Sequence, residues 1–315
     1  MDTLIIEKKN EVYITVDCDP NVQRELSEFF TFYVPGYKFM PAFRNRMWDG
    51  KIRLFSQKTK EIYFGLYPYI RAFAEERGYQ IVTGKDVEID NKVNKDTVKK
   101  FSNSLGQKFA ARDYQIDAIY HSLKFNRALL LSPTASGKSF IIYALIRYYS
   151  HLIKDNPNNR ILLIVPTTSL VEQMYSDFQS YGWNVKKNCH RLYSGYSNQT
   201  DKKVLISTWQ SLYKLPKKYF EQFGCVFGDE AHLFKSKSLT EIMTKLEDCK
   251  YRIGLTGTLD GAQTHKLVLE GLFGAVNKVT STRKLMDKKQ LSNLVVRCLI
   301  LKHTPDNCKM VASGK

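Results

Sequence analysis

A short loop between an apolar run and a helical stretch restricts the fold of this chain more than any other feature. The loop is Ser132-Pro133-Thr134-Ala135-Ser136-Gly137-Lys138-Ser139, between apolar residues 128–131 and a stretch with helical periodicity, residues 140–149. Strand, loop and helix in this order are typical of a loop that binds nucleotide phosphates through backbone N–H groups and the positive helix end. Lys138 can reach the β- and γ-phosphates, and the Ser139 hydroxyl can bind Mg²⁺. Ser132 stands where the usual pattern has its first glycine, so a second motif is needed.

That second motif is Asp229-Glu230-Ala231-His232, which follows the apolar run 225–228. A carboxylate at the C-terminal end of a parallel strand projects into the crevice where phosphates bind. Asp229 is then placed to hold Mg²⁺ through water, and Glu230 to orient the water that attacks the γ-phosphate. The alternative is an acidic pair at a solvated helix N-terminus, where the dipole favours acids. Together the motifs predict ATP and Mg²⁺ as cofactors, with Lys138, Asp229 and Glu230 as catalytic residues.

The charge of the chain indicates a polyanionic partner. The 315 residues carry a formal net charge of +17, and self-repulsion of this size disfavours a compact state unless a partner neutralises it. Nucleic acid is the expected partner, because no basic amphipathic helix and no apolar run near ~20 residues suggests a membrane. We find no secretory signal, and the six cysteines contain no C-x-x-C pair, so we expect reduced thiols in a cytoplasmic protein. They are Cys18, Cys189, Cys225, Cys249, Cys298 and Cys308.

The chain is long enough for more than one domain, and its first part is predicted to be a small α+β domain, residues 1–85. Alternation over 11–17 predicts a strand, and Asp19-Pro20 predicts a helix start. Residues 51–55 and 61–64 flank a polar turn and predict a hairpin, and a helix over 68–77 should end at Gly78. Residues 86–108 are polar and charge-rich over most of their length, and we expect a linker there.

The region from 109 to 282 alternates short apolar segments with helix-length segments. Residues 129–131, 161–165, 204–207, 225–227 and 252–255 are apolar on both faces, as in central strands of a parallel sheet covered by helices. The predicted fold class is therefore α/β, a RecA-like P-loop NTPase domain with a central parallel sheet, preceded by the small α+β domain. Residues 283–315 are expected to be a connector toward a second RecA-like domain that these residues do not contain.

Six motifs in a fixed order carry a resemblance to a known family. They resemble the N-terminal motifs of superfamily 2 helicases with a DEAH signature, of the XPB and RecG kind, over about residues 109–282. The motifs are Arg112-Asp113-Tyr114-Gln115, the loop 132–139, Val165 to Gln173, Ile206 to Leu212, Asp229 to His232, and Leu255-Thr256-Gly257-Thr258.

The resemblance assigns further roles. It implies that Gln115, supported by Arg112, recognises adenine, whereas a buried structural glutamine is the alternative. It implies contacts to the backbone of one nucleic-acid strand by Pro166, Thr167, Thr168, Ser207, Thr208, Trp209 and Gln210. Helix N-capping by Thr168 and Ser169 is the alternative there. Thr256 and Thr258, with His232 beside them, would couple hydrolysis to nucleic-acid binding.

The resemblance also implies an activity and its limits. The expected partner is DNA, branched or duplex with a single strand, and an RNA–DNA hybrid is a further candidate. A complete helicase of this kind has a second RecA-like domain whose Q-x-x-G-R-x-x-R motif supplies arginine fingers, worth ~10³ to 10⁵ in rate. That motif is missing from these residues, so we expect weak nucleotide binding and little hydrolysis or unwinding. A P-loop kinase, a non-catalytic DNA-binding module, and restriction-type or chromatin-type translocases remain alternatives, and a monomer is assumed.

A segment of the first domain, residues 37–53, interleaves cations with aromatic residues. Cations neutralise phosphates and aromatic rings stack on exposed bases, so the segment predicts DNA contact by Arg44, Arg46, Lys51 and Arg53. The alternative is a small core of Phe39, Phe43 and Trp48 with solvated cations around it.

Overall fold

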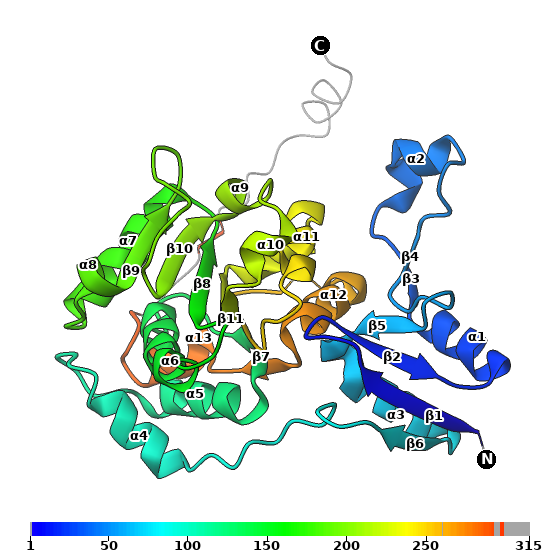
Figure 1. The fold of residues 1–315 in the computed structure, drawn as a ribbon, viewed down its shortest axis with the longest axis horizontal. Helices are drawn as coiled ribbons and strands as arrows, with labels where there is room; N and C mark the ends of the chain where they lie inside the picture. Colours follow the sequence, from blue (N-terminus) through cyan, green and yellow to red (C-terminus); the bar gives the residue numbers. More distant parts are fainter. Residues whose placement is uncertain (1, 260, 293–296, 299–315) are drawn as a thin grey trace. The chain divides into compact units, whose positions relative to one another are not determined.

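The computed structural model of the protein describes residues 2–259, 261–292 and 297–298 (Figure 1). Residues up to Ser281 form one compact unit, and a second unit begins at Thr282. The predicted connector, 283–315, lies largely outside the described residues, and its described part contains most of helix α13 (Thr282–Asp287). Cys308 also lies outside them, whereas the other five cysteines are free thiols. Within the described ranges, no helix has the length and apolarity needed to cross a membrane.

The larger part of the first unit is built on a seven-stranded parallel sheet. Its order is β13-β7-β12-β11-β8-β10-β9, and every neighbouring pair is parallel. The strands are β7 (Arg127–Leu131), β8 (Arg160–Val165), β9 (Cys189–Leu192), β10 (Val204–Thr208), β11 (Phe223–Asp229), β12 (Tyr251–Thr256) and β13 (Val276–Lys278). The five predicted strands and the fold class are confirmed. The two edge strands, β9 and β13, were not predicted.

Helices cover both faces of this sheet, as expected for strands that are apolar on both sides. In β8, Leu162 and Ile164 belong to one core, and Ile161, Leu163 and Val165 belong to the other. The second of these cores contains residues of α4 (Lys95–Asn103), α5 (Asp113–Phe125), α6 (Lys138–Leu152), α7 (Thr168–Ser180) and α8 (Val185–Asn188). The first contains residues of α9 (Trp209–Leu212), α10 (Lys217–Phe220), η3 (Ala231–Lys235), α11 (Lys237–Lys245) and α12 (Gln263–Phe273).

The N-terminal domain is a four-stranded sheet with two helices. Its order is β5-β2-β1-β6, in which only β1 and β6 pair in parallel. The elements are β1 (Thr3–Lys8), β2 (Tyr13–Asp17), α1 (Pro20–Phe29), β5 (Glu61–Tyr63), η2 (Phe64–Leu66), α3 (Tyr67–Arg77) and β6 (Gln80–Thr83). Both predicted helix boundaries are confirmed. The Asp19 carboxylate accepts from the N–H of Asn21, and Gly78 ends α3 with φ of 70°.

The predicted hairpin between residues 51–55 and 61–64 is wrong. β4 (Lys51–Arg53) pairs with β3 (Thr31–Tyr33), whereas β5 joins the main sheet of this domain beside β2. Between them, only Ser56 and Glu61 form an isolated bridge. Figure 1 shows β3 and β4 rising as an arm that carries α2 (Pro41–Arg44) at its far end. We call residues 31–53 the arm and residues 37–48, which include η1 (Tyr37–Phe39), its tip.

The predicted linker contains a helix. α4 lies within residues 86–108, buries Val98 and Ser102, and packs against α5. The sequence did not predict α4 because the segment is mostly polar. A helix that buries only one narrow stripe needs few apolar residues. Asn94 begins the helix by accepting hydrogen bonds from the N–H groups of Asp96 and Thr97.

One apolar core joins the N-terminal domain to the larger sheet. Residues such as Leu4 and Ile70 belong to the same core as Val226 and Phe273. At this junction an alanine Cβ at Gly65 would lie 1.9 Å from the carbonyl oxygen of Glu270, so only glycine fits there. The domains are therefore packed as tightly as parts of one domain.

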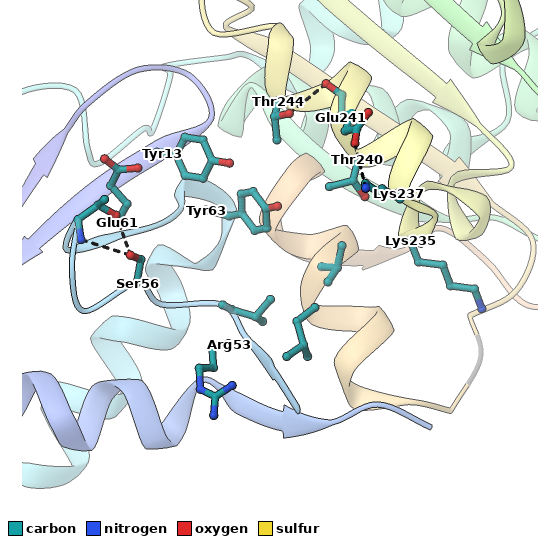
Figure 2. A pocket seen from close by; sticks show the side chains of 14 residues that line it. Tyr13, Arg53, Ser56, Glu61, Tyr63, Lys235, Lys237, Thr240, Glu241 and Thr244 are labelled. Atoms are coloured by element: carbon teal, nitrogen blue, oxygen red, sulfur yellow. Dashed lines mark hydrogen bonds and ion pairs between the residues drawn. The ribbon is translucent and has the colours of Figure 1, made fainter. Parts of the chain in front are cut away.

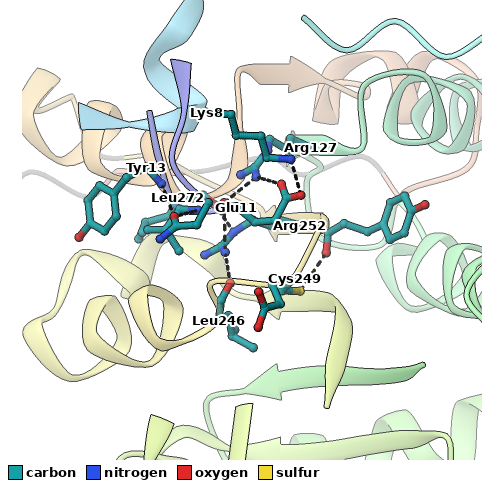
Figure 3. A network of polar contacts seen from close by, with 12 residues as sticks. Lys8, Glu11, Tyr13, Arg127, Leu246, Cys249, Arg252 and Leu272 are labelled. Carbon is teal, nitrogen blue, oxygen red and sulfur yellow. Dashed lines mark hydrogen bonds and ion pairs between the residues drawn. The ribbon is translucent and has the colours of Figure 1, made fainter. Parts of the chain in front are cut away.

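A buried polar network crosses the same junction (Figure 3). Glu11 accepts from Nη2 of Arg127 at 2.9 Å, and its backbone carbonyl accepts from Arg127 and from Nη1 of Arg252. Arg252 is fully buried and otherwise donates to backbone carbonyls of Leu272, Leu246 and Met243. Burial would raise the pKa of Glu11, but Arg127 and Lys8 outweigh it and lower that pKa. A carboxylate of the N-terminal domain thus partly neutralises two buried cations of the larger sheet, Arg127 in β7 and Arg252 in β12.

Candidate nucleotide and nucleic-acid site

The loop predicted to bind phosphates follows β7 and leads into α6, at the C-terminal ends of the parallel strands. Two of its residues adopt left-handed backbone conformations, Ala135 with φ of 63° and Gly137 with φ of 81°. A Cβ at Gly137 would lie 2.4 Å from Nε2 of Gln115 and displace that side chain, so both space and conformation favour glycine. Gly137 precedes the first residue of α6, Lys138.

Ser132, which replaces the usual glycine, is explained by a hydrogen-bond pair inside the loop. Its hydroxyl lies 2.6 Å from the hydroxyl of Ser136, which also lies 2.6 Å from the carbonyl oxygen of Pro133. Both serines are buried, so their polar atoms need such partners. Serine in place of the usual glycine therefore adds a hydrogen bond that stabilises the loop from within.

Residues 112–115 hold this loop from the outside. The side chains of Tyr114 and Gln115 each donate to the carbonyl oxygen of Ser136 at 3.0 Å, and Arg112 donates to the Tyr114 hydroxyl at 2.7 Å. The Gln115 side-chain oxygen accepts from the N–H of Arg112. Gln115 thus makes two hydrogen bonds within the protein, and one amide N–H and one lone pair remain, so its contact with adenine stays a prediction. The role of Tyr114 was missed, although it lies inside the recognised motif.

The predicted catalytic residues meet beside the loop. Nζ of Lys138 lies 3.2 Å from Oε1 of Glu230, and Asp229 is the last residue of β11. Glu230 has φ of 50° and ψ of 51°, a conformation that is unfavourable for a residue with a Cβ. Strained residues concentrate at functional sites, where the surrounding structure maintains them.

Asp229 is an unusually placed carboxylate. Only 3% of its surface is exposed, and its Oδ1 has no hydrogen-bond partner among the described residues. Burial, with a smaller contribution from the charge of Glu230, raises the pKa of Asp229 to about 6, against the opposing effect of Lys138. A buried carboxylate oxygen without a partner fits a bound cation or its water ligands, so the residues present fit Mg²⁺.

Ser139, the other predicted Mg²⁺ ligand, is engaged elsewhere. Its hydroxyl lies 2.9 Å from the hydroxyl of Tyr181, and it also hydrogen-bonds Asp177. Burial raises the pKa of Asp177, and that hydrogen bond partly offsets the increase. A hydroxyl that donates its hydrogen to one of these partners keeps oxygen lone pairs for a metal ion, so these contacts are compatible with the predicted role of Ser139. No motif in the sequence indicated Asp177 or Tyr181.

The three residues predicted to couple hydrolysis to nucleic-acid binding form a connected chain. Nδ1 of His232 lies 3.3 Å from Oε2 of Glu230 and 2.9 Å from Oγ1 of Thr256. The Thr256 hydroxyl donates to the carbonyl oxygen of Thr258 at 2.9 Å. Because a hydroxyl has one hydrogen, Thr256 accepts from His232, whose Nδ1 therefore carries a hydrogen.

Comparisons with known proteins agree with these motifs. Residues 6–84 match the family model described as DNA helicase UvsW, N-terminal, and residues 108–261 match type III restriction enzyme, res subunit. The ATP-dependent DNA helicase uvsW of enterobacteria phage T4 is 32% identical over 312 residues, or 96% of this chain. A crystal structure of the UvsW helicase from bacteriophage T4 is 31% identical with a TM-score of 0.79. It covers 88% of this chain and 99% of the solved chain.

The chain belongs to the UvsW family of superfamily 2 helicases. It spans 61% of the length of the T4 helicase. The DNA 3'-5' translocase XPB2 of Sulfurisphaera tokodaii is 26% identical over 155 residues, 48% of this chain and 31% of that protein. Because the N-terminal domain matches a UvsW model, the UvsW type is favoured over the restriction-type and chromatin-type motors, whose distinction rests on appended domains.

The two loops predicted to contact a nucleic-acid strand differ in accessibility. At the end of β8 in this UvsW-family chain, Thr167 and Thr168 are exposed and Pro166 is half-buried. Thr167, rather than the suggested Thr168 and Ser169, caps α7 by accepting from the N–H of Leu170. N-capping of α7 therefore occurs, but through Thr167 and not through Thr168 or Ser169.

At the end of β10, most of the predicted contacts face inward. Ser207 is fully buried, and its hydroxyl donates to the carbonyl oxygens of Leu192 and Thr208. Thr208 is also buried, with its hydroxyl 3.2 Å from that of Ser211. Trp209 is half-buried against the core, and Gln210 alone of the four is exposed. Ser207 is structural here, because its single hydroxyl hydrogen is already used.

The four arm cations are not equivalent. Arg44 and Arg46 are exposed and form no ion pair with any described residue, whereas Arg53 pairs with Asp49. Nζ of Lys51 lies 5.0 Å above the ring of Tyr33. Arg44 and Arg46 are therefore the two that are ready for a phosphate.

A cleft of about 680 Å³ lies between the base of the arm and the larger sheet's helices (Figure 2). Arg53 lines it from the arm, and Lys235 and Lys237 line it from η3 and the start of α11. Tyr13 and Tyr63 stack at its wall, with ring centroids 5.3 Å apart. Cationic residues thus continue from the arm toward the segment that follows Asp229 to His232.

Proposed function

We propose that this chain binds ATP and Mg²⁺ at the residue 132–139 loop and Asp229, as the nucleotide-binding part of a motor that remodels branched DNA. The observation that carries the proposal is the buried, unpartnered oxygen of Asp229 beside the Lys138–Glu230 pair. Three charged groups converge at the strand ends, where α/β sheets bind ligands. A phosphate chain would attract Lys138 directly, and its Mg²⁺ would supply the partner that the Asp229 oxygen lacks.

Lys138, Glu230 and Asp229 each have one proposed role in ATP hydrolysis. Lys138 leaves Glu230 and binds the β- and γ-phosphate oxygens, because phosphate carries more negative charge than one carboxylate. Glu230, released, accepts a hydrogen bond from the attacking water and orients it toward the γ-phosphorus. Asp229 and Ser139 would hold Mg²⁺, which would neutralise charge on the phosphate oxygens when bound.

The chain from Glu230 to Thr258 transmits the change. When Glu230 exchanges Lys138 for water, its carboxylate moves, and the contact between its second oxygen and Nδ1 of His232 changes. The same nitrogen of His232 contacts the Thr256 hydroxyl. Residues 256–258 lead to α12, whose Thr264 donates to the backbone carbonyl of Tyr33 at the base of the arm. We infer that nucleotide binding biases the arm through two sets of contacts, one from Glu230 to Thr258 and one from Thr264 to Tyr33.

The proposed substrates are branched DNA and RNA–DNA hybrids, in phage recombination, repair and replication. Support comes from the net charge of +17, the exposed Thr167, Thr168 and Gln210, and the arm cations. Hydroxyl and amide groups suit sequence-independent phosphate contacts. We further propose that these 315 residues alone hydrolyse ATP slowly, because they contain no Q-x-x-G-R-x-x-R motif to supply arginine fingers.

Steady-state ATP hydrolysis with and without forked DNA tests the proposal. It is measured for this chain and for a version extended through a second RecA-like domain, each with a Glu230→Gln control. We expect DNA-stimulated hydrolysis in the extended form, at least ~10³-fold faster than this chain and lost in the variant. Rapid hydrolysis by this chain alone, or hydrolysis that survives Glu230→Gln, would contradict the proposal.

A further inference from the structure

We propose that Phe39 and Met47, at the tip of the arm, form an apolar wedge that stacks against the terminal base pair at a DNA branch point. The proposal rests on the proposed function and deepens it, because it separates a base-contacting role from the phosphate contacts of the arm cations.

Exposure is the first observation. Phe39 is 79% exposed and Met47 is 82% exposed, the largest values for a large apolar side chain in the described ranges. The next is Tyr33 at 54%, and Met40 at 36% also belongs to the arm. Single exposed apolar residues are common, but several on one small projection indicate a contact surface.

The aromatic residues of the arm fall into two groups. Tyr33 stacks on Tyr37 at 4.6 Å, and Tyr37 meets Phe43 edge-to-face at 4.8 Å. The Trp48 indole N–H donates to the carbonyl oxygen of Lys51 at 2.8 Å. Phe39 has no part in these contacts, and the suggested core of Phe39, Phe43 and Trp48 is not formed, because none of the three is buried.

This internal group gives the tip a fixed support. Gly50 has φ of 78°, and a Cβ there would lie 2.3 Å from the ring of Tyr37, so the return strand is packed directly on the stack. Backbone N–H groups of Met47 and Trp48 both donate to the carbonyl oxygen of Ala42 in α2. A supported tip loses little entropy on binding, which suits a wedge.

Charge identifies the partner as nucleic acid. Residues 37–48 contain three cations, Lys38, Arg44 and Arg46, and no acidic residue. A groove of about 610 Å³ at the tip is lined by these cations, by Phe43, Met47 and Trp48, and by Asp49, whose carboxylate pairs with Arg53. Apolar side chains that insert at base steps, flanked by cations on the phosphates, are a known way to hold unstacked DNA. A branch point fits best, because its bases are already partly unstacked and cost less to open.

The test uses forked DNA with 2-aminopurine either at the branch or well inside the duplex arm. The variants are Phe39→Ala/Met47→Ala, Arg44→Glu/Arg46→Glu, and Val82→Ala, an exposed apolar control on β6. We expect wild-type protein to raise fluorescence at the branch only. The Phe39→Ala/Met47→Ala variant should lose that rise and lose about fivefold or more in its preference for forked over linear DNA. Phe39→Trp should retain both.

The outcomes separate the wedge from the wider proposal. Arg44→Glu/Arg46→Glu should weaken binding to both DNAs together and reduce the salt dependence. Unchanged affinity in that variant would contradict the phosphate contacts of the proposed function. A normal fluorescence rise at the branch in Phe39→Ala/Met47→Ala would overturn the wedge. The wedge would also be overturned if this variant bound both DNAs normally and lost only binding to anionic vesicles or self-association. Both alanines are at exposed sites, so the unfolding temperature should not change.

Discussion

Nδ1 of His232 lies 2.9 Å from Oγ1 of Thr256, and this contact joins the residues after β11 to the end of β12. Glu230 contacts the same nitrogen at 3.3 Å. The proposed water-activating carboxylate and the segment leading to α12 therefore share one imidazole. We propose that a change at one end of this contact alters the other, which is what coupling between two sites requires.

Replacing the His232 imidazole should uncouple ATP hydrolysis from DNA binding without preventing either ligand from binding. In a chain extended through a second RecA-like domain, we expect His232→Ala to reduce DNA stimulation of ATP hydrolysis by ~5- to 150-fold. Nucleotide affinity should change by less than ~3-fold, because His232 contacts Glu230 rather than the loop. Parallel hydrolysis and nucleotide-binding assays give both numbers, and an equal loss in both would show that His232 acts in the binding site itself.

Asp229 should make stability depend on pH. Its pKa of about 6 lies above the ordinary value of 3.8, so the native state binds more protons than the unfolded state between these pH values. Stability should therefore fall as pH rises through that window. Without nucleotide and Mg²⁺, Asp229→Asn should be more stable than wild type at pH 7 by ~1–3 kcal/mol. Below pH 4 that gain should vanish.

Urea unfolding at pH 4 and pH 7 measures this difference. Asp155→Asn is the matched control, since that carboxylate has 86% of its side chain exposed. A wild type as stable as Asp229→Asn at pH 7 would mean that Asp229 ionises without penalty and needs no cation.

Glu11 should hold the two domains together as one folding unit. Glu11→Gln leaves Arg127 and Arg252 buried without a carboxylate, and breaking a buried ion pair in this way costs ~3–5 kcal/mol. The lowered pKa of Glu11 means that its contribution is present at neutral pH and is lost as pH falls below its ordinary range near 4.5. Glu7→Gln, at an exposed site on β1, is the control. Two separate unfolding transitions in wild type would contradict a single unit.

Ser207 and Gln210 should behave in opposite ways although they lie in one motif. Ser207→Ala removes a buried hydroxyl that donates to two carbonyls, so it should cost ~1–3 kcal/mol of stability. Its effect on DNA affinity should follow only from that loss. Gln210→Ala should leave stability unchanged and weaken DNA binding by ~2- to 13-fold. Thermal unfolding and fluorescence anisotropy distinguish them, and the reverse pattern would place the strand contact at Ser207.

Several parts of the fold and the candidate site were predictable because local rules determine them. Central strands buried on both faces are apolar throughout, so β8 and β11 were visible, and Gly78 and Asp19 marked helix ends by backbone geometry. What escaped prediction depends on distant partners. β4 pairs with β3 rather than β5, α4 is stable only against α5, and the edge strands β9 and β13 are too short to stand out.

The same distinction applies to the site. Motif order identified Lys138, Asp229 and Glu230, because spacing along the chain fixes their positions at strand ends. Motif order did not indicate that Gln115 and Ser207 are buried and hydrogen-bonded inside the protein. Asp177 lies in α7 and Tyr181 at the C-terminal end of that helix, and both contact Ser139. No local sequence pattern predicts such a contact.

The most direct test of the central claim is the affinity of this 315-residue chain for a fluorescent ATP analogue, with and without Mg²⁺, in wild type and Lys138→Ala. We predict weak, Mg²⁺-dependent binding that Lys138→Ala reduces by ~10-fold or more, since a charge-assisted contact to phosphate is worth about 1.5–3 kcal/mol. Equal binding by the two proteins, or binding indifferent to Mg²⁺, would contradict the assignment of the residue 132–139 loop and Asp229 as the ATP site.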